Sequence, residues 1–192
     1  MQRVILDANV LYPAALRDLL MHLTLARGFR AHWTHLIHDE WTRNVQRERP
    51  DITAAQLQRT RDLMDAHAGD ALVTGFERRI KQLRLPDLDD RHVLAAAIHI
   101  GATRIVTFNL KDFPAESLDP HGVSASHPDP FLLEVLTAYP ANTVLAVRRQ
   151  WQSMRAPAVS LEELVVILER QGLPKFVGAL RDELATQDPS QT

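Results

Sequence analysis

The stretch that decides the fold is Leu85–Phe113, LPDLDDRHVLAAAIHIGATRIVTFNLKDF. Apolar residues recur at helical spacing over Val93–Ile98, so they form a helix face that must pack on a core. We expect this helix to end at Gly101, because glycine readily takes the left-handed conformation that closes helices. The β-branched and aromatic run Arg104–Phe108 then predicts a buried strand, followed by the polar turn Asn109–Pro114. In open parallel α/β sheets, ligands bind where such turns leave the strands.

Asp90 stands at the start of this helix. It precedes Val93 by three residues and Leu94 by four, so it projects from the first turn on the buried side of the helix. Two interpretations remain open. Asp89 or Asp90 caps the free N–H groups of the first turn, or Asp90 belongs to a site beside the core.

Two more acids stand where core-forming elements end. The segment Arg3–Asp7 predicts a buried strand that finishes in an acid, although Asp7 or Asn9 is also a candidate cap for the apolar helix that follows. A second helix is expected over about His35–Arg49, and Glu40 lies at the edge of its apolar stripe. The ordinary alternative for Glu40 is a solvated or ion-paired face residue.

The remaining patterns alternate between strands and helices up to about residue 125. Further strands are expected over Phe29–Thr34, Asp70–Gly75 and Gly122–Ser126. Beyond His127 the periodicity is helical throughout. We therefore expect an α/β domain over residues 1–125 and an all-helical extension over residues 126–192.

Composition and charge narrow the function classes. The chain is 45% hydrophobic and 24% charged, as in ordinary globular proteins, and it has no cysteine, which excludes disulfides and thiolate metal sites and fits the cytoplasm. It lacks an apolar run long enough to span a membrane, and we expect neither a membrane segment nor an export signal. With a formal net charge of −2, nucleic-acid binding would need local basic patches. Two runs are candidates, with solvated faces as the alternative: Arg78, Arg79, Lys81 and Arg84, and Arg43, Arg47 and Arg49.

Parallel strands would bring the acids of these separate segments to one edge of the sheet, together with the amide of Asn109. Crowded carboxylates raise one another's pKa, and a cation relieves that repulsion. Oxygen donors without thiolate favour Mg²⁺ or Mn²⁺, ions that polarise a phosphoryl oxygen and activate water. The pattern therefore suits phosphodiester hydrolysis at a site where these side chains meet: Asp7, Glu40, Asp90, Asn109 and Asp112. Its four acids are the candidate catalytic groups.

Four pieces of the sequence carry a family resemblance: VILDANVL (residues 4–11), HDEWTRNV (38–45), LPDLDDRHVLAAAI (85–98) and IVTFNLKDFP (105–114). With these pieces, residues 1–125 resemble a PIN domain, specifically a VapC-type ribonuclease toxin of bacterial toxin–antitoxin pairs. The resemblance implies an α/β fold with a parallel sheet of about five strands flanked by helices, and a metal-dependent endoribonuclease.

The resemblance also implies roles for individual residues. Asp7, Glu40 and Asp90 would bind Mg²⁺ or Mn²⁺, and the turn Asn109–Asp112 would complete the site. Many relatives have an acid where this chain has Asn109, so two residues are candidates for the fourth ligand, Asn109 itself and Asp112. Asp87 and Asp89 are lower-ranked candidates nearby.

The partners implied by the resemblance are an RNA substrate, a cognate antitoxin that blocks the site, and a second copy of the chain in a homodimer. Residues 126–192 resemble the helical extension of a longer subset of these proteins. We interpret them as a docking or dimer-supporting element, with an RNA-positioning role open for Arg148, Arg149 and Arg155.

Two other functions compete with the nuclease. A PIN-like module that binds RNA or protein without cleavage is favoured by Asn109 in place of an acid. The second is a phosphatase with Asp7 as nucleophile. Such an enzyme needs a second acid two residues after the nucleophile, and this chain has Asn9 at that position. The histidines show no zinc spacing, so His35, His38 and His92 are expected at the surface or behind the ligands rather than on a metal.

Overall fold

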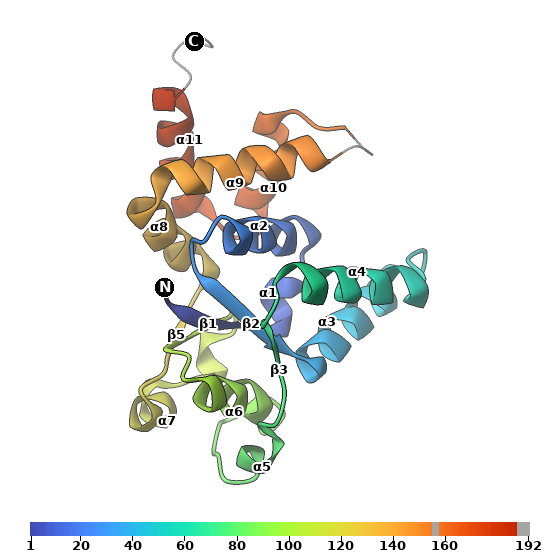
Figure 1. Ribbon diagram of the computed structural model, residues 1–192, viewed down its shortest axis with the longest axis vertical. Coiled ribbons are helices and arrows are strands. Elements are labelled where there is room, and N and C mark those ends of the chain that lie inside the picture. Colours follow the sequence, from blue (N-terminus) through green and yellow to red (C-terminus); the bar gives the residue numbers. More distant parts are fainter. Residues whose placement is uncertain (155–157, 188–192) are drawn as a thin grey trace. The chain divides into compact units, whose positions relative to one another are not determined.

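The computed structural model describes residues 1–154 and 158–187 (Figure 1). Five strands in these residues pair in parallel into one sheet with the spatial order β3-β2-β1-β4-β5. The predicted parallel α/β sheet is therefore confirmed. The strands are β1 (Arg3–Leu6), β2 (Arg30–Thr34), β3 (Leu72–Val73), β4 (Arg104–Val106) and β5 (Ser124–Ser126).

The strand order reverses between β1 and β4, which makes this position the topological switch point of the sheet. From β1 the chain adds β2 and β3 on one side of the sheet, and then β4 and β5 on the other. Loops that leave two such neighbouring strands diverge, which opens a crevice at their carboxyl ends. Leu6 pairs with Val106, and the Asp7 N–H donates to the Val106 carbonyl at 3.1 Å. The residues that follow these two strands therefore begin side by side at that crevice.

Helix α6 (Arg91–Ile100) is the main support of the sheet, because it packs on β1, β2 and β4. Its residues from Val93 to Ala97 are fully buried, and Gly101 closes it with a φ of 64°, as the sequence predicts. Helices α3 (His35–Glu48) and α4 (Ala54–His67) pack beside each other (Figure 1). The shorter helices are α1 (Ala8–Leu11), α5 (Glu77–Ile80), η1 (Leu110–Asp112), α7 (Ala115–Leu118) and η2 (Asp119–His121).

The helix predicted after Asp7 is divided in two. Helix α1 ends at Leu11, and α2 (Ala14–Leu25) begins after Pro13. Proline lacks a backbone N–H and its ring collides with the preceding turn, so it interrupts a helix unless it lies in the first turn. The proline thereby separates the residues next to Asp7 from the leucine-rich helix.

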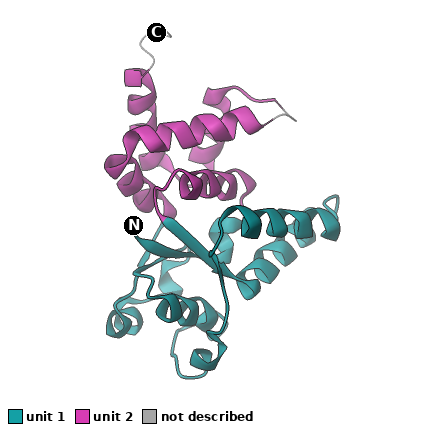
Figure 2. Cartoon of the chain, in the orientation of Figure 1, with its two compact units in different colours: residues 1–12, 30–127 teal, residues 13–29, 128–192 magenta. Residues whose placement is uncertain are grey.

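The described chain forms two compact units (Figure 2). Unit 1 contains residues 1–12 and 30–127, and unit 2 contains residues 13–29 together with the residues from 128 onward. The expected boundary at residue 125 followed chain order, whereas α2 packs on helices of the C-terminal region. The physical reason is its face of fully buried leucines: Leu16, Leu19, Leu20 and Leu23.

Unit 2 is entirely helical, in agreement with the predicted extension. It joins α2 to α8 (Pro128–Ala138), α9 (Pro140–Ser153), α10 (Leu161–Arg170) and α11 (Pro174–Gln187). Helix α11 packs on α8, and α2 packs on α9 and α10. In the described residues no single helix is long and apolar enough to span a membrane. Helices α8 and α9, which are bent by 118° relative to each other, are together long and apolar enough, by length and composition only.

Side chains distant in sequence satisfy the first turns of the helices in unit 2. Asp129 accepts hydrogen bonds from the backbone N–H groups of Phe176, at 2.8 Å, and Lys175, at 3.3 Å. The Gln171 side chain accepts from the Leu16 N–H at 2.9 Å. These free N–H groups would otherwise be buried without partners, so the caps fix how the helices of this unit pack.

Candidate metal centre

Asp7 lies directly after β1 and is held by three donors. Its Oδ1 accepts from the Ala8 N–H at 2.7 Å, and its Oδ2 accepts from the Asn9 amide and the Thr107 hydroxyl, both at 2.7 Å. Only 4% of the residue is exposed, and this burial raises the pKa of the carboxyl despite the hydrogen bonds. Asp7 therefore caps α1 and at the same time lies at the crevice. Asn9 supplies an amide donor to Asp7 and no second acid.

The turn after β4 continues this hydrogen-bond network. The Phe108 N–H donates to the Asn9 side-chain oxygen, and the Asn109 N–H donates to the Thr107 hydroxyl, both at 3.0 Å. The Asn109 amide nitrogen donates to Oδ2 of Asp112. Asn109 thus orients a neighbouring carboxylate.

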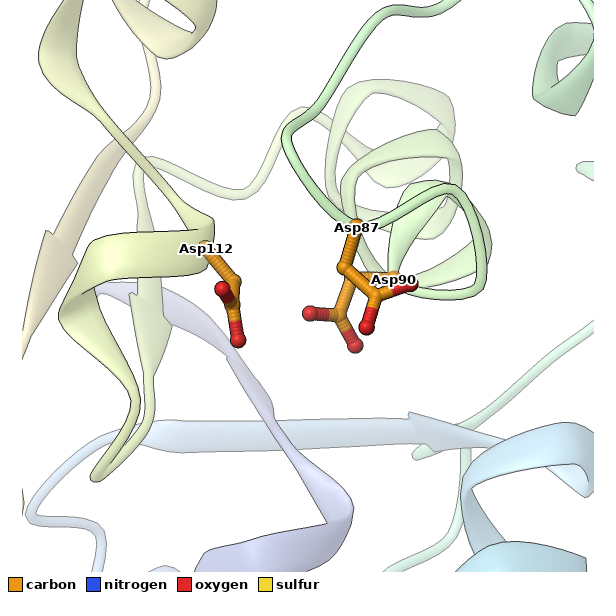
Figure 3. Close-up of side chains that lie close together, drawn as sticks. All are labelled: Asp87, Asp90 and Asp112. Atoms are coloured by element: carbon orange, nitrogen blue, oxygen red, sulfur yellow. The ribbon is translucent and has the colours of Figure 1, made fainter.

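Three carboxylates meet in front of this turn, and we call Asp87, Asp90 and Asp112 the acidic cluster. One oxygen of each lies within 4.8 Å of the other two. Figure 3 shows Asp112 on one side and the Asp87 and Asp90 side chains on the other, turned toward a shared space. Asp112 comes from η1, and Asp90 is the residue just before α6. Two of the predicted site residues are brought together here, whereas Asp7 and Glu40 lie outside this group.

Asp87, a lower-ranked candidate in the sequence analysis, is a member of the acidic cluster. It accepts a hydrogen bond from the Asp89 N–H at 2.8 Å, and this tight turn sets the direction of its side chain. Asp89 is exposed, as Asp87 is, but it does not join the cluster. The spacing of three residues between Asp87 and Asp90 was the available signal, but three-residue spacing fixes a common side only once the turn conformation is known.

The pKa of Asp90 is strongly raised by its surroundings. Its burial, followed by the charges of Asp7, Asp87, Asp112 and Glu40, raises its pKa to about 7. It makes no capping hydrogen bond to α6, so the interpretation as a helix cap fails in the described structure. A carboxylate without donors and surrounded by acids needs a proton or a cation.

Glu40, on α3, is also close enough to the acids of the site to be affected by their charge. Burial is the main cause of its raised pKa, and Asp7, Asp87 and Asp89 raise it further, while Arg43 opposes them. Its side chain keeps 41% exposure, so it stands at the solvent side of the site. Glu40 is thus repelled by Asp87, which belongs to the acidic cluster, and by Asp7, which does not. Asp7 and Glu40 therefore lie close enough to the cluster to interact with it electrostatically.

None of the three histidines considered above belongs to the acidic cluster in the described residues. His38 is buried rather than at the surface: it accepts from the Trp41 indole at 2.9 Å through Nδ1, so its Nε2–H donates to Asp65 at 3.0 Å. His92 Nε2 lies 3.9 Å from a Glu40 oxygen, beyond hydrogen-bond distance. His35 is exposed and its ring lies against Phe76.

The basic candidates have different surroundings. The charged residues of the run from Arg78 to Arg84 are all exposed. They lie on α5 and on the turn that leads to the acidic cluster. On α9, Arg149 is exposed and Arg148 is half-buried, and Arg155 lies outside the described residues.

The donor set fits a hard divalent cation. Around one octahedral Mg²⁺ ion, neighbouring oxygens lie about 3 Å apart and opposite oxygens about 4.2 Å apart, so the three carboxylates would have to draw closer together to bind a single ion. The donors are carboxylate oxygens, which suit Mg²⁺ and Mn²⁺. A bound cation would also remove the repulsion that raises the pKa of Asp90.

Comparisons with known proteins agree with this architecture. The PIN domain family matches residues 3–111, and the VapC50 C-terminal domain matches residues 128–182. A Mycobacterium tuberculosis protein named "Putative ribonuclease VapC50" is 39% identical over 92 residues, which are 48% of this chain and 54% of that protein. The chain spans about half the length of this curated relative. No solved structure shows a significant match. Since the family match covers more than half of the chain, including strands β1 to β4 and most of the site, the chain belongs to the PIN domain family.

Proposed function

We propose that this PIN domain protein is a divalent-metal-dependent endoribonuclease that hydrolyses RNA phosphodiester bonds. The proposal rests mainly on the acidic cluster beyond the ends of β1 and β4. The charges of Asp7 and Glu40 act on this cluster as well, and the pKa of Asp90 is raised to about 7. The relative named as a ribonuclease supports the same chemistry.

The residues divide into ligands and groups that hold them. Asp87, Asp90 and Asp112 would hold Mg²⁺ or Mn²⁺, and Asp7 and Glu40 would close the site from the β1 and α3 sides. When bound, such an ion polarises the scissile phosphate and lowers the pKa of an attacking water.

Three polar side chains preorganise the site around these acids. Thr107 and Asn9 keep Asp7 in one orientation through their 2.7 Å hydrogen bonds, and Asn109 orients Asp112. Supporting hydrogen bonds of this kind fix ligand direction and raise metal affinity. A phosphatase with Asp7 as nucleophile is disfavoured because the residue two positions on is Asn9, which donates a hydrogen bond to Asp7 and supplies no second acid.

We extend the proposal to the biological setting. The relative's name and the match to the VapC50 C-terminal domain favour the toxin of a toxin–antitoxin pair, active on RNA in the cytoplasm. A cognate antitoxin would block the site, and the toxin would act as a homodimer. Copurification of the chain with the product of an adjacent small gene, and the mass of the complex, test these partners.

Cleavage of total RNA tests the nuclease directly. The purified, antitoxin-free protein is given Mn²⁺, EDTA or neither, beside Asp90→Asn and the matched control Asp62→Asn, which changes an exposed aspartate on α4. We expect discrete products that require metal, vanish in Asp90→Asn and persist in Asp62→Asn. A folded Asp90→Asn variant that cuts at the wild-type rate refutes the proposal. Metal-independent RNA binding without any cleavage would instead establish the non-catalytic binding module.

A further inference from the structure

We infer that an exposed face of α3 guides the RNA strand away from the acidic cluster, with Arg43 and Arg47 in contact with successive phosphates. We call Glu40, Arg43 and Arg47 the α3 stripe. The inference rests on the proposed RNA substrate and adds the path that the strand takes beyond the scissile bond.

Helix geometry aligns the stripe with the site. Residues three and seven positions after Glu40 return to the same helix face. At 1.5 Å per residue, Arg43 lies about 4.5 Å and Arg47 about 10.5 Å along the axis beyond Glu40. Arg43 is close enough to Glu40 to lower the pKa of that carboxyl. Arg43 and Arg47 therefore form a row of positive charge that begins one turn beyond Glu40 and continues along the same helix. Figure 1 shows α3 as one continuous helix.

The structure separates the three arginines that the sequence grouped together. Arg49 holds both carboxylate oxygens of Asp51, through Nε at 2.9 Å and Nη2 at 2.6 Å. Arg43 and Arg47 are exposed and form no ion pair with any residue that the structure describes. Glu48, the acid next to Arg47 in sequence, accepts a hydrogen bond from the Tyr12 hydroxyl at 2.5 Å. Arg43 and Arg47 therefore remain available to a ligand, while Arg49 is engaged.

The charge of the site explains why such a row is needed. The acidic cluster repels a polyanion, and the formal net charge of −2 gives no general attraction. Exposed arginines are usually only solvated, but here two of them continue the face that bears Glu40. Arginine forms strong charge-assisted bonds to phosphate, and these contacts position a strand without reading its bases. The stripe thus fits single-stranded RNA of any sequence.

The salt dependence of RNA binding tests the stripe independently of catalysis. Binding of fluorescent oligo(A) and oligo(U) is measured over a range of salt concentrations in the Asp90→Asn background, with Arg43→Gln, Arg47→Gln and the double variant. Arg49→Gln is the matched control, because it removes the same charge from the end of the same helix. We expect the slope of log affinity against log salt to fall by about 0.7 per arginine for single-stranded RNA. The double variant should bind about tenfold more weakly at low salt, equally for both oligonucleotides, and Arg49→Gln should match the parent.

Three results would overturn the inference: an unchanged slope in the double variant, an equal effect of Arg49→Gln, or a loss restricted to one base. An unchanged slope would leave a protein partner as the ligand of the stripe. The wild-type cleavage assay separates this failure from failure of the proposed function. Metal-dependent cleavage with an unchanged slope refutes the stripe alone, whereas a wild-type protein that neither cuts nor binds RNA refutes both.

Discussion

Asp90 in unit 1 and Asp129 in unit 2 are aspartates with opposite surroundings. Asp129 is 5% exposed and accepts two backbone N–H groups at the start of α11. Asp90 makes no capping hydrogen bond to its helix and faces other acids, which together with burial raise its pKa to about 7. A buried acid with donors stabilises the fold, whereas an acid among acids weakens it unless a cation binds. The donors around an acid therefore separate structural from functional aspartates in this chain.

The largest expected effect follows from Asp90→Asn, which removes a charge from the acidic cluster. RNA cleavage should fall by about a thousandfold, because the site loses one of its charged ligands. The metal-free variant should at the same time melt about 2–4 °C higher, since relief of repulsion is worth about 1 kcal/mol. Cleavage of total RNA and thermal unfolding in EDTA measure the two effects on the same sample.

Asp62→Asn is the control for this pair of measurements, because Asp62 is exposed on α4 and accepts a hydrogen bond from Gln58. It should change neither cleavage nor the melting temperature. If metal-free Asp90→Asn melts below the wild type, the proposed conflict between charge and stability at the site is refuted.

Asp129→Ala should have the opposite effect on stability. It leaves the N–H groups of Lys175 and Phe176 without their partner, so the free energy of unfolding should fall by about 2–3 kcal/mol. Asp129→Asn keeps an acceptor oxygen and should lose about half as much. Urea unfolding measures both variants, and a loss below about 0.5 kcal/mol for Asp129→Ala would remove the contrast with Asp90.

Much of unit 1 was predictable because its signals are local. The alternation of short apolar runs with helical stripes gave the five strands, and Gly101 closes α6 as expected. Asp7 follows a buried strand, and parallel pairing places it beside the residues after β4. Chain order and the periodicity of the strands therefore suffice to bring Asp7 beside the residues that follow β4.

What the sequence could not give depends on contacts between distant residues. The apolar face of α2 is visible in the sequence, but periodicity does not say which helices cover it, so the grouping of α2 with the helices from residue 128 onward comes from the structure alone. The partners of Asp129 lie on α11, more than 40 residues away in sequence, and no local pattern indicates them. Asp87 and Asp89 are indistinguishable by type and position until the turn shows that only Asp87 joins the cluster.

The pair Asp87 and Asp89 gives a sharper test of the site at smaller expected effect. Asp87→Asn should lower the affinity for Mn²⁺ and the cleavage rate about 10- to 100-fold, because a ligand loses its charge. Asp89→Asn should stay within about twofold, since its backbone N–H, which supports Asp87, is unchanged. Manganese titration and RNA cleavage measure both variants. Equal losses would mean that general acidity near α6 matters and the geometry of the cluster does not.

The smallest expected effect is the pH dependence of stability in metal-free protein. The pKa of Asp90 rises from 3.8 to about 7 on folding, so the folded chain binds more protons than the unfolded chain between these values. The free energy of unfolding must then fall as pH rises through this window. Asp7 and Glu40, whose pKa values are raised as well, contribute with the same sign. Because solvent partly screens Asp90, we expect a loss of only about 1 kcal/mol between about pH 5 and about pH 8.

Urea unfolding in EDTA at both pH values measures this loss, and Asp90→Asn should flatten it because the titrating group is gone. Added Mn²⁺ should restore stability mainly at the higher pH, where the carboxylates are ionised and bind the cation without first losing a proton. Asp129→Asn is the comparison variant, because the Asp129 carboxylate accepts hydrogen bonds from backbone N–H groups and does not face other acids. Unlike Asp90→Asn, it should leave the stability difference between the two pH values as it is in the wild type. If the metal-free wild type is equally stable at both pH values, its acids do not repel one another as the structure requires, and the distinction between the two aspartates loses its electrostatic basis.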